Sequence, residues 1–99
     1  ETHGILTLEK IKKFTSSVLS KYPVDYAYLF GSYAKEKATE SSDIDLLVST
    51  SITGMKFFGL IEELRQELKK KVEVITLSSL EDNQELLHEI LKDGIKIYG

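Results

Sequence analysis

The 99-residue chain, 41% hydrophobic and 29% charged, is expected to fold as a single small domain over residues 1–99. Because it contains no cysteine, it can form neither a disulfide framework nor a cysteine-ligated zinc site, which fits a cytoplasmic location. The formal net charge of −3 argues against charge-driven binding to nucleic acid, and no apolar run approaches the roughly 20 residues of a membrane-spanning helix.

The first third of the chain predicts a helix followed by a strand. Residues 7–22 carry apolar side chains at steps of three and four, which is typical of an amphipathic helix, and Thr7 is a suitable N-cap. Pro23 cannot continue that helix. Residues 24–30 are rich in aromatic and aliphatic side chains, so we expect a strand there.

A polar connection follows this strand. Gly31 and Ser32 predict a tight turn, residues 33–38 predict a short helix, and residues 39–42 predict a loop. Glycine lets a backbone approach a phosphate closely, the Ser32 hydroxyl can donate to it, and a helix beginning here would point its N–H groups toward an anion.

The next predicted strand, residues 43–49, carries two acidic side chains. Because side chains alternate along a strand, Asp43 and Asp45 are expected on one face. Two adjacent carboxylates cost free energy unless cations neutralise them, which favours a binding site over a purely structural role. The opposite face is expected to carry the apolar residues Ile44, Leu46 and Val48.

The second half alternates helices and strands. Residues 55–70 predict an amphipathic helix, and residues 71–76 predict a strand that places Glu73 on the face opposite its valines. Residues 82–92 predict a further helix, which Gly94 ends, and residues 95–98 predict a last strand. The apolar stripe expected on the first of these helices is formed by Phe58, Ile61, Leu64 and Leu68.

This order of elements predicts an α/β fold, in which a small mixed sheet of about four strands is flanked by helices. We expect the helices to cover one side of the sheet.

The acidic residues and the glycine–serine turn together predict a metal–nucleotide site. Two divalent ions about 3.5–4 Å apart can activate a hydroxyl and stabilise a departing pyrophosphate. Asp43, Asp45 and Glu73 offer the oxygen ligands that magnesium prefers. Lys35 lies near enough in sequence to offset phosphate charge, although a solvent-exposed loop lysine is an equally good interpretation.

The motif Gly31-Ser32-x-Ala34, seven residues, then Ser42-Asp43-x-Asp45-Leu46 resembles the signature of the DNA polymerase β-like nucleotidyltransferases. It is most similar to the minimal nucleotidyltransferases (MNT), which transfer a nucleoside monophosphate from a triphosphate to a hydroxyl, using magnesium. The resemblance implies a two-metal site in which Asp43 and Asp45 hold both ions and Glu73 holds one and helps to activate the acceptor hydroxyl. It also implies that the residues Gly31, Ser32, Lys35 and Ser42 bind the nucleotide.

Many minimal nucleotidyltransferases act as the antitoxin of a helical HEPN toxin. By this resemblance, the chain is expected to transfer AMP from ATP to a hydroxyl of a HEPN-type partner protein. Two alternatives remain open: a small-molecule acceptor such as an aminoglycoside, and an inactive domain that only binds its partner. Glu36, near the turn at Gly31 and Ser32 (the phosphate turn), most favours the inactive domain. A homo-oligomer is also compatible with the sequence.

Overall fold

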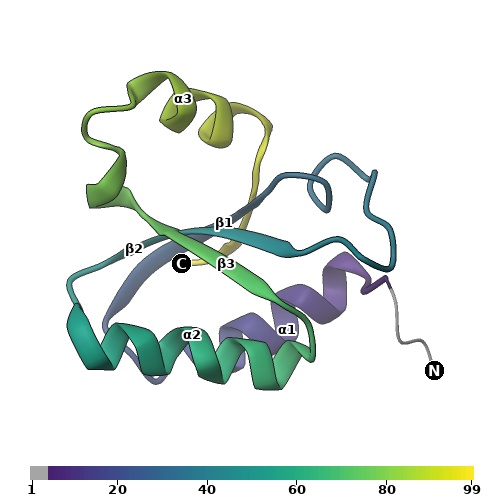
Figure 1. The fold of residues 1–99 in the computed structure, drawn as a ribbon, viewed down its shortest axis with the longest axis horizontal. Coiled ribbons are helices and arrows are strands. Elements are labelled where there is room, and N and C mark those ends of the chain that lie inside the picture. The colour runs from purple at the N-terminus through teal and green to yellow at the C-terminus, as the bar shows by residue number, and fades with distance from the viewer. Residues whose placement is uncertain (1–4) are drawn as a thin grey trace.

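The computed structural model describes residues 5–99, so residues 1–4 of the predicted domain lie outside the described part (Figure 1). A four-stranded sheet lies at its centre, with helices packed against it. The elements in chain order are α1 (Leu8–Leu19), β1 (Val24–Phe30), β2 (Ile44–Thr50), α2 (Gly54–Leu68), β3 (Val72–Thr76), the 3-10 helix η1 (Leu77–Leu80), α3 (Gln84–Asp93) and β4 (Ile95–Tyr98). The predicted α/β fold with a small mixed sheet is confirmed.

The strand order is β3-β2-β1-β4. The central strands β1 and β2 pair antiparallel, β4 pairs antiparallel with β1, and β3 pairs parallel with β2. Parallel pairing of β2 and β3 needs a crossover, which α2 supplies. As a result, the strand that carries Asp45 lies between the strand that leads into Gly31 and the strand that carries Glu73.

The helices cover both faces of the sheet, so the expectation that they lie on one side was wrong. The helices α1 and α2 pack on one face, over Leu46 and Val48, while α3 packs on the other, over Leu47 (Figure 1). The physical reason is that β2 is the central strand and carries consecutive apolar residues, which must be buried on both faces. The core under α3 is the smaller one and consists of Leu47, Leu80 and Ile90 with partly buried neighbours.

The ends of several helices differ from the sequence prediction. Helix α2 ends at Leu68, because Lys69 adopts a left-handed conformation with φ 56° that a right-handed helix cannot continue. Its buried stripe is Leu60, Leu64 and Leu68, whereas Phe58, predicted to be in the core, is 59% exposed. The predicted burial of Leu64 and Leu68 is confirmed, but at the start of the helix Phe57 rather than Phe58 packs against the core. The 3-10 helix η1 was not predicted.

Helix α1 has the predicted cap: the Thr7 side chain accepts a hydrogen bond from the Lys10 N–H at 3.2 Å. At its other end, the Tyr22 hydroxyl donates to the Glu63 carboxylate at 2.7 Å and ties the exit of α1 to α2. Over residues 5–99, none of the helices combines the length and the apolar character that crossing a membrane requires.

Candidate functional site

The candidate site is built on one row of residues across the sheet. Asp45 on β2 lies opposite Phe30 on β1 and, on its other side, opposite Glu73 on β3. The next row along the strands is apolar, because Leu47 lies between Tyr28 and Ile75 and is covered by α3. Asp45 therefore stands at the edge of the α3 core, where the sheet changes from covered to open.

Asp45 and Gly31 are in direct contact. A Cβ atom added to Gly31 would lie 2.3 Å from the Asp45 Oδ2 atom, and Gly31 has a φ of +76° that L side chains rarely adopt. The chain thus needs glycine at this position for two reasons, its backbone conformation and the closeness of the carboxylate. This brings the predicted phosphate turn and one predicted metal ligand side by side.

Asp45 is surrounded by unfavourable conditions for a negative charge. Burial raises the pKa of the Asp45 carboxyl above its ordinary value, and the negative charges of Glu73 and Asp43 raise it further. Asp45 and Asp43 are half-buried, whereas Glu73 is exposed. Ionised Asp45 is therefore in an environment that disfavours its charge, and a bound cation would relieve that cost.

Asp43 lies just before β2, which begins at Ile44 rather than at residue 43 as predicted. The loop that leads to Asp43 is held by its own hydrogen bonds: the Thr39 N–H donates to the Ser42 Oγ at 2.8 Å, and the Lys70 Nζ donates to the Glu40 carbonyl at 3.0 Å. The Ser42 hydroxyl is thus used to close this loop, and Ser42 does not line the pocket beside Gly31.

The acidic side chains do not form a closed metal cage. Within the described part of the chain, no three histidine or carboxylate side chains come close enough together to hold a metal ion. Asp45 and Glu73 are paired in the register of β2 and β3. Asp43 lies two residues before Asp45, just outside β2, so the backbone places all three at one end of these strands. Their side chains would have to turn toward a common point to share an ion.

The segment after Gly31 is a series of turns and not the predicted helix over residues 33–38. The Gly31 carbonyl accepts from the Ala34 and Lys35 N–H groups at 3.1 Å, and the Ser32 carbonyl accepts from the Lys37 N–H at 2.9 Å. Glu36 has a φ of 58°, which stops a right-handed helix after a single turn. The Glu36 side chain lines a groove on the α1 side of the sheet and not the pocket beside Gly31.

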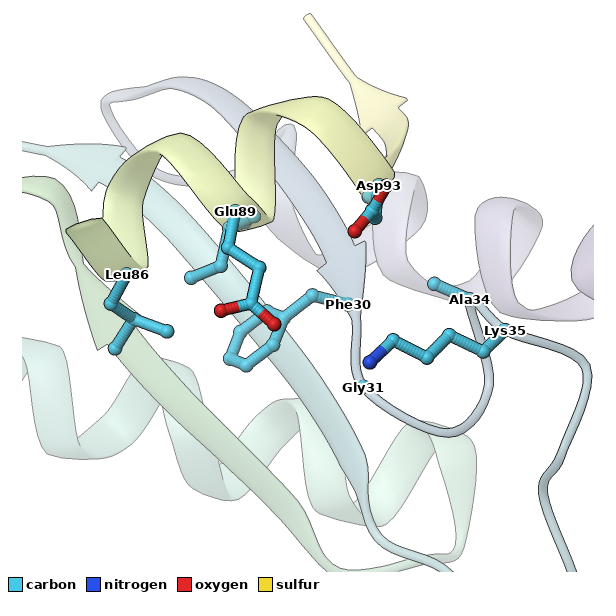
Figure 2. A pocket seen from close by; sticks show the side chains of 9 residues that line it. Phe30, Gly31, Ala34, Lys35, Leu86, Glu89 and Asp93 are labelled. Atoms are coloured by element: carbon cyan, nitrogen blue, oxygen red, sulfur yellow. The ribbon is translucent and has the colours of Figure 1, made fainter.

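A pocket of about 130 Å³ lies between the Gly31 turn and α3 (Figure 2). Gly31 and Lys35 form one wall, and the Lys35 side chain extends along it toward Gly31. Three further lining residues were not singled out from the sequence: Phe30, Glu89 and Asp93. The four-residue spacing of the last two places them on one face of α3, but only the tertiary structure shows that this face meets the phosphate turn.

Comparison with known proteins identifies the family. Residues 9–99 match the family described as Polymerase beta, Nucleotidyltransferase. A Methanocaldococcus jannaschii protein named "Putative protein adenylyltransferase MJ0435" is 36% identical over 93 residues, which cover 91% of each chain. A second protein of that organism, "Putative protein adenylyltransferase MJ1379", is 38% identical over 76 residues, which cover 73% of this chain and 76% of the relative.

Solved structures share the fold. A toxin–antitoxin structure with AMP-PNP contains a chain of 25% identity that matches with a TM-score of 0.69, covering 95% of this chain and 74% of the other. A complex of tri-AMPylated HEPN toxin from Shewanella oneidensis with MNT antitoxin contains a chain that matches with a TM-score of 0.66 at 21% identity. The match covers 92% of this chain and 71% of the other. The chain therefore belongs to the polymerase β-type nucleotidyltransferases, a family of enzymes whose relatives here are named protein adenylyltransferases.

Proposed function

We propose that this nucleotidyltransferase transfers AMP from ATP to a hydroxyl group of a partner protein, and that it is the antitoxin of a HEPN-type toxin. The single observation that carries the proposal is the contact between Asp45 and Gly31, in register with Glu73. It supports a site in which the α-phosphate lies between the glycine turn and the carboxylates. The toxin–antitoxin structure with AMP-PNP, at 25% identity, supports ATP as the nucleotide.

The residues present suit magnesium. All three candidate ligands are carboxylates, and their mutual repulsion around half-buried Asp45 is the charge pattern that a divalent cation stabilises. We assign Asp43 and Asp45 to both ions of a two-metal site and Glu73 to one of them. When bound, magnesium would lower the pKa of the acceptor hydroxyl and neutralise charge that develops on the leaving pyrophosphate.

The other residues bind and orient the nucleotide. The Gly31 turn lets its backbone approach the phosphates, Ser32 offers a hydroxyl donor, and Lys35 supplies a positive charge at the pocket wall. The acceptor oxygen forms a bond to the α-phosphorus, while the bond from that phosphorus to the bridging oxygen breaks and pyrophosphate leaves with the electron pair. We assign to Glu73 the role of accepting the hydroxyl proton, because it is the exposed member of the three carboxylates.

The partner protein presents the acceptor hydroxyl in this proposal. Glu73 and Lys35 are exposed, so the site is accessible to a second macromolecule. Glu36, the residue that most favoured an inactive domain, lines a separate groove, so its carboxylate does not oppose phosphate binding beside Gly31.

The test is incubation of the protein with magnesium, ATP labelled at the α-phosphate and the product of the neighbouring gene. We expect label on the partner protein, and we expect Asp43→Asn to abolish it. Asp82→Asn, an exposed carboxylate in the turn before α3, is the matched control and should label the partner normally.

Each other outcome assigns a different function. If Asp43→Asn and Asp45→Asn neutralise the partner as well as the unchanged protein does, the domain acts by binding alone. If small molecules such as aminoglycosides take the label and proteins do not, the acceptor is a small molecule.

A further inference from the structure

Two carboxylates of α3 face the phosphate turn across the pocket. Glu89 and Asp93 both line it from α3, and Figure 2 shows the Lys35 side chain extending along the opposite wall. Within residues 5–99, neither carboxylate takes part in a salt bridge. Both are therefore available to a ligand.

Carboxylates restrict which part of a nucleotide can lie in this pocket. Unless a cation lies between them, an ionised carboxylate only accepts hydrogen bonds and repels phosphate oxygens. The two proposed metal ions are assigned to Asp43, Asp45 and Glu73, so Glu89 and Asp93 disfavour the triphosphate on their side of the pocket. The groups of ATP that donate hydrogen bonds are the ribose hydroxyls and the amino group of the base. The pocket volume of about 130 Å³ is well below the roughly 300–1,000 Å³ of pockets that enclose a complete drug-sized ligand, so only a part of the nucleotide enters it.

The position of Gly31 identifies that part. Gly31 contacts Asp45, where we place the α-phosphate, and it also lines the pocket. In a nucleoside triphosphate, the ribose is joined to the α-phosphate through a single oxygen. With the α-phosphate beside Gly31, the part of the nucleotide that enters the neighbouring pocket is therefore the ribose, and the base lies beyond it.

We propose that Glu89 and Asp93 accept hydrogen bonds from the ribose 2′- and 3′-hydroxyls and make this site selective for ribonucleotides. The inference rests on the proposed function, which supplies the nucleotide. It adds a specificity determinant on α3, an element outside the Gly-Ser and Asp-x-Asp motif.

The test is calorimetric titration of the full chain, in magnesium, with ATP, 2′-deoxy-ATP and 3′-deoxy-ATP. We expect ATP to bind about tenfold or more tightly than at least one deoxy analogue, because hydrogen bonds to charged groups are among the stronger ones. Glu89→Gln and Asp93→Asn should each weaken ATP binding toward the level of a deoxy analogue while leaving the affinity for that analogue unchanged or improved. Glu85→Gln, on the same helix but outside the pocket lining, should behave like the unchanged protein.

Three results would overturn the inference while leaving the proposed function intact. The first is equal binding of ATP and both deoxy analogues by the unchanged protein. The second is a uniform loss of affinity for all three nucleotides in the α3 variants, which would indicate a structural role. The third is a change in the preference for ATP over GTP with no change in the preference for ribose, which would mean that the carboxylates read the base. If magnesium and ATP do not bind at all, both the inference and the proposed function fail.

Discussion

The Asp45 carboxylate lies against the Cα of Gly31, where a Cβ atom would be 2.3 Å from Oδ2. Gly31→Ala would therefore push the Asp45 side chain away from the turn, in addition to straining a backbone with φ of +76°. We expect the substitution to destabilise the fold by about 1–3 kcal/mol, as overpacking commonly does. We also expect it to weaken binding of magnesium and ATP at least about tenfold, measured by calorimetry.

Gly54→Ala is the matched control for this substitution. Gly54 also has a positive φ, of +64°, but nothing lies within 4 Å of the position of its Cβ. Its replacement measures the backbone strain alone and should leave nucleotide binding unchanged. If Gly31→Ala and Gly54→Ala cost the same in stability and neither affects binding, the contact with Asp45 has no functional role.

Asp45→Asn should stabilise the protein and inactivate it. Burial and the charges of Glu73 and Asp43 raise the pKa of the Asp45 carboxyl, so its ionised form is disfavoured in the folded state at neutral pH. We expect the neutral amide to raise the melting temperature in the absence of magnesium. We also expect a loss of about a thousandfold in transfer rate, which corresponds to several kcal/mol of lost transition-state stabilisation.

The pH dependence of this effect has a definite sign. Because the pKa of the Asp45 carboxyl is higher in the folded than in the unfolded chain, the folded state binds more protons between these two pKa values. The free energy of unfolding therefore falls as pH rises through that window. The stability difference between Asp45→Asn and the unchanged protein should therefore grow from acid toward neutral pH. Thermal unfolding of both proteins from about pH 3 to pH 7 measures it. A difference that is constant over this range would contradict the assigned environment.

Magnesium should make the unchanged protein more stable than Asp45→Asn, the reverse of the order expected without it. An ion that binds only the folded state stabilises it by about 2.7 kcal/mol at one hundred times its dissociation constant. We expect this gain for the unchanged protein and a much smaller one for Asp45→Asn. Potassium chloride at matched ionic strength is the control, because general screening would raise the stability of the unchanged protein without a specific site.

The sequence was sufficient to predict the four strands and the three α-helices in their order along the chain. Alternation along residues 43–49 predicted that Asp45 lies on the opposite face of the sheet from Leu46 and Val48. The burial of these two side chains under α1 and α2 confirms the face predicted for them. The position of α3 was not predicted, because amphipathic spacing indicates that a helix has an apolar face and not which side of the sheet it covers. The consecutive residues Leu46 and Leu47 were a usable signal, since a strand that is apolar on both faces must be covered twice.

The parts of the candidate site that depend on local backbone conformation or on tertiary contacts were beyond sequence reasoning. The left-handed residue Glu36 is what turns a predicted helix into a series of turns, and glutamate gives little indication of that conformation. Glu89 and Asp93 look like ordinary solvent-facing helix residues until α3 is placed over Phe30. The assignments of Gly31, Ser32, Lys35 and Ser42 to nucleotide binding stay predictions.

Lys35→Met tests the charge at the pocket wall. Lys35 lines the pocket beside Gly31 opposite two carboxylates, so its positive charge offsets their repulsion of an approaching triphosphate. We expect an exposed contact of this kind to contribute about 1 kcal/mol, so that the dissociation constant for ATP rises about fivefold. Lys37→Met, two residues on and outside the pocket lining, should change the affinity little. If the two variants weaken ATP binding equally, the overall charge of the protein and not the position of Lys35 determines the affinity.

Ser42→Ala distinguishes a nucleotide-binding role from a structural one. The Ser42 Oγ accepts a hydrogen bond from the Thr39 N–H at 2.8 Å and closes the loop that leads into Asp43. We therefore expect a stability loss of about 0.5–1.5 kcal/mol in urea unfolding, together with weaker binding of magnesium. Lys70→Met removes the other hydrogen bond to this loop, at the Glu40 carbonyl, without touching Ser42. If both variants weaken magnesium binding, the loop positions Asp43. If only Ser42→Ala has an effect, and it weakens ATP binding without changing stability, the Ser42 hydroxyl contacts the nucleotide directly.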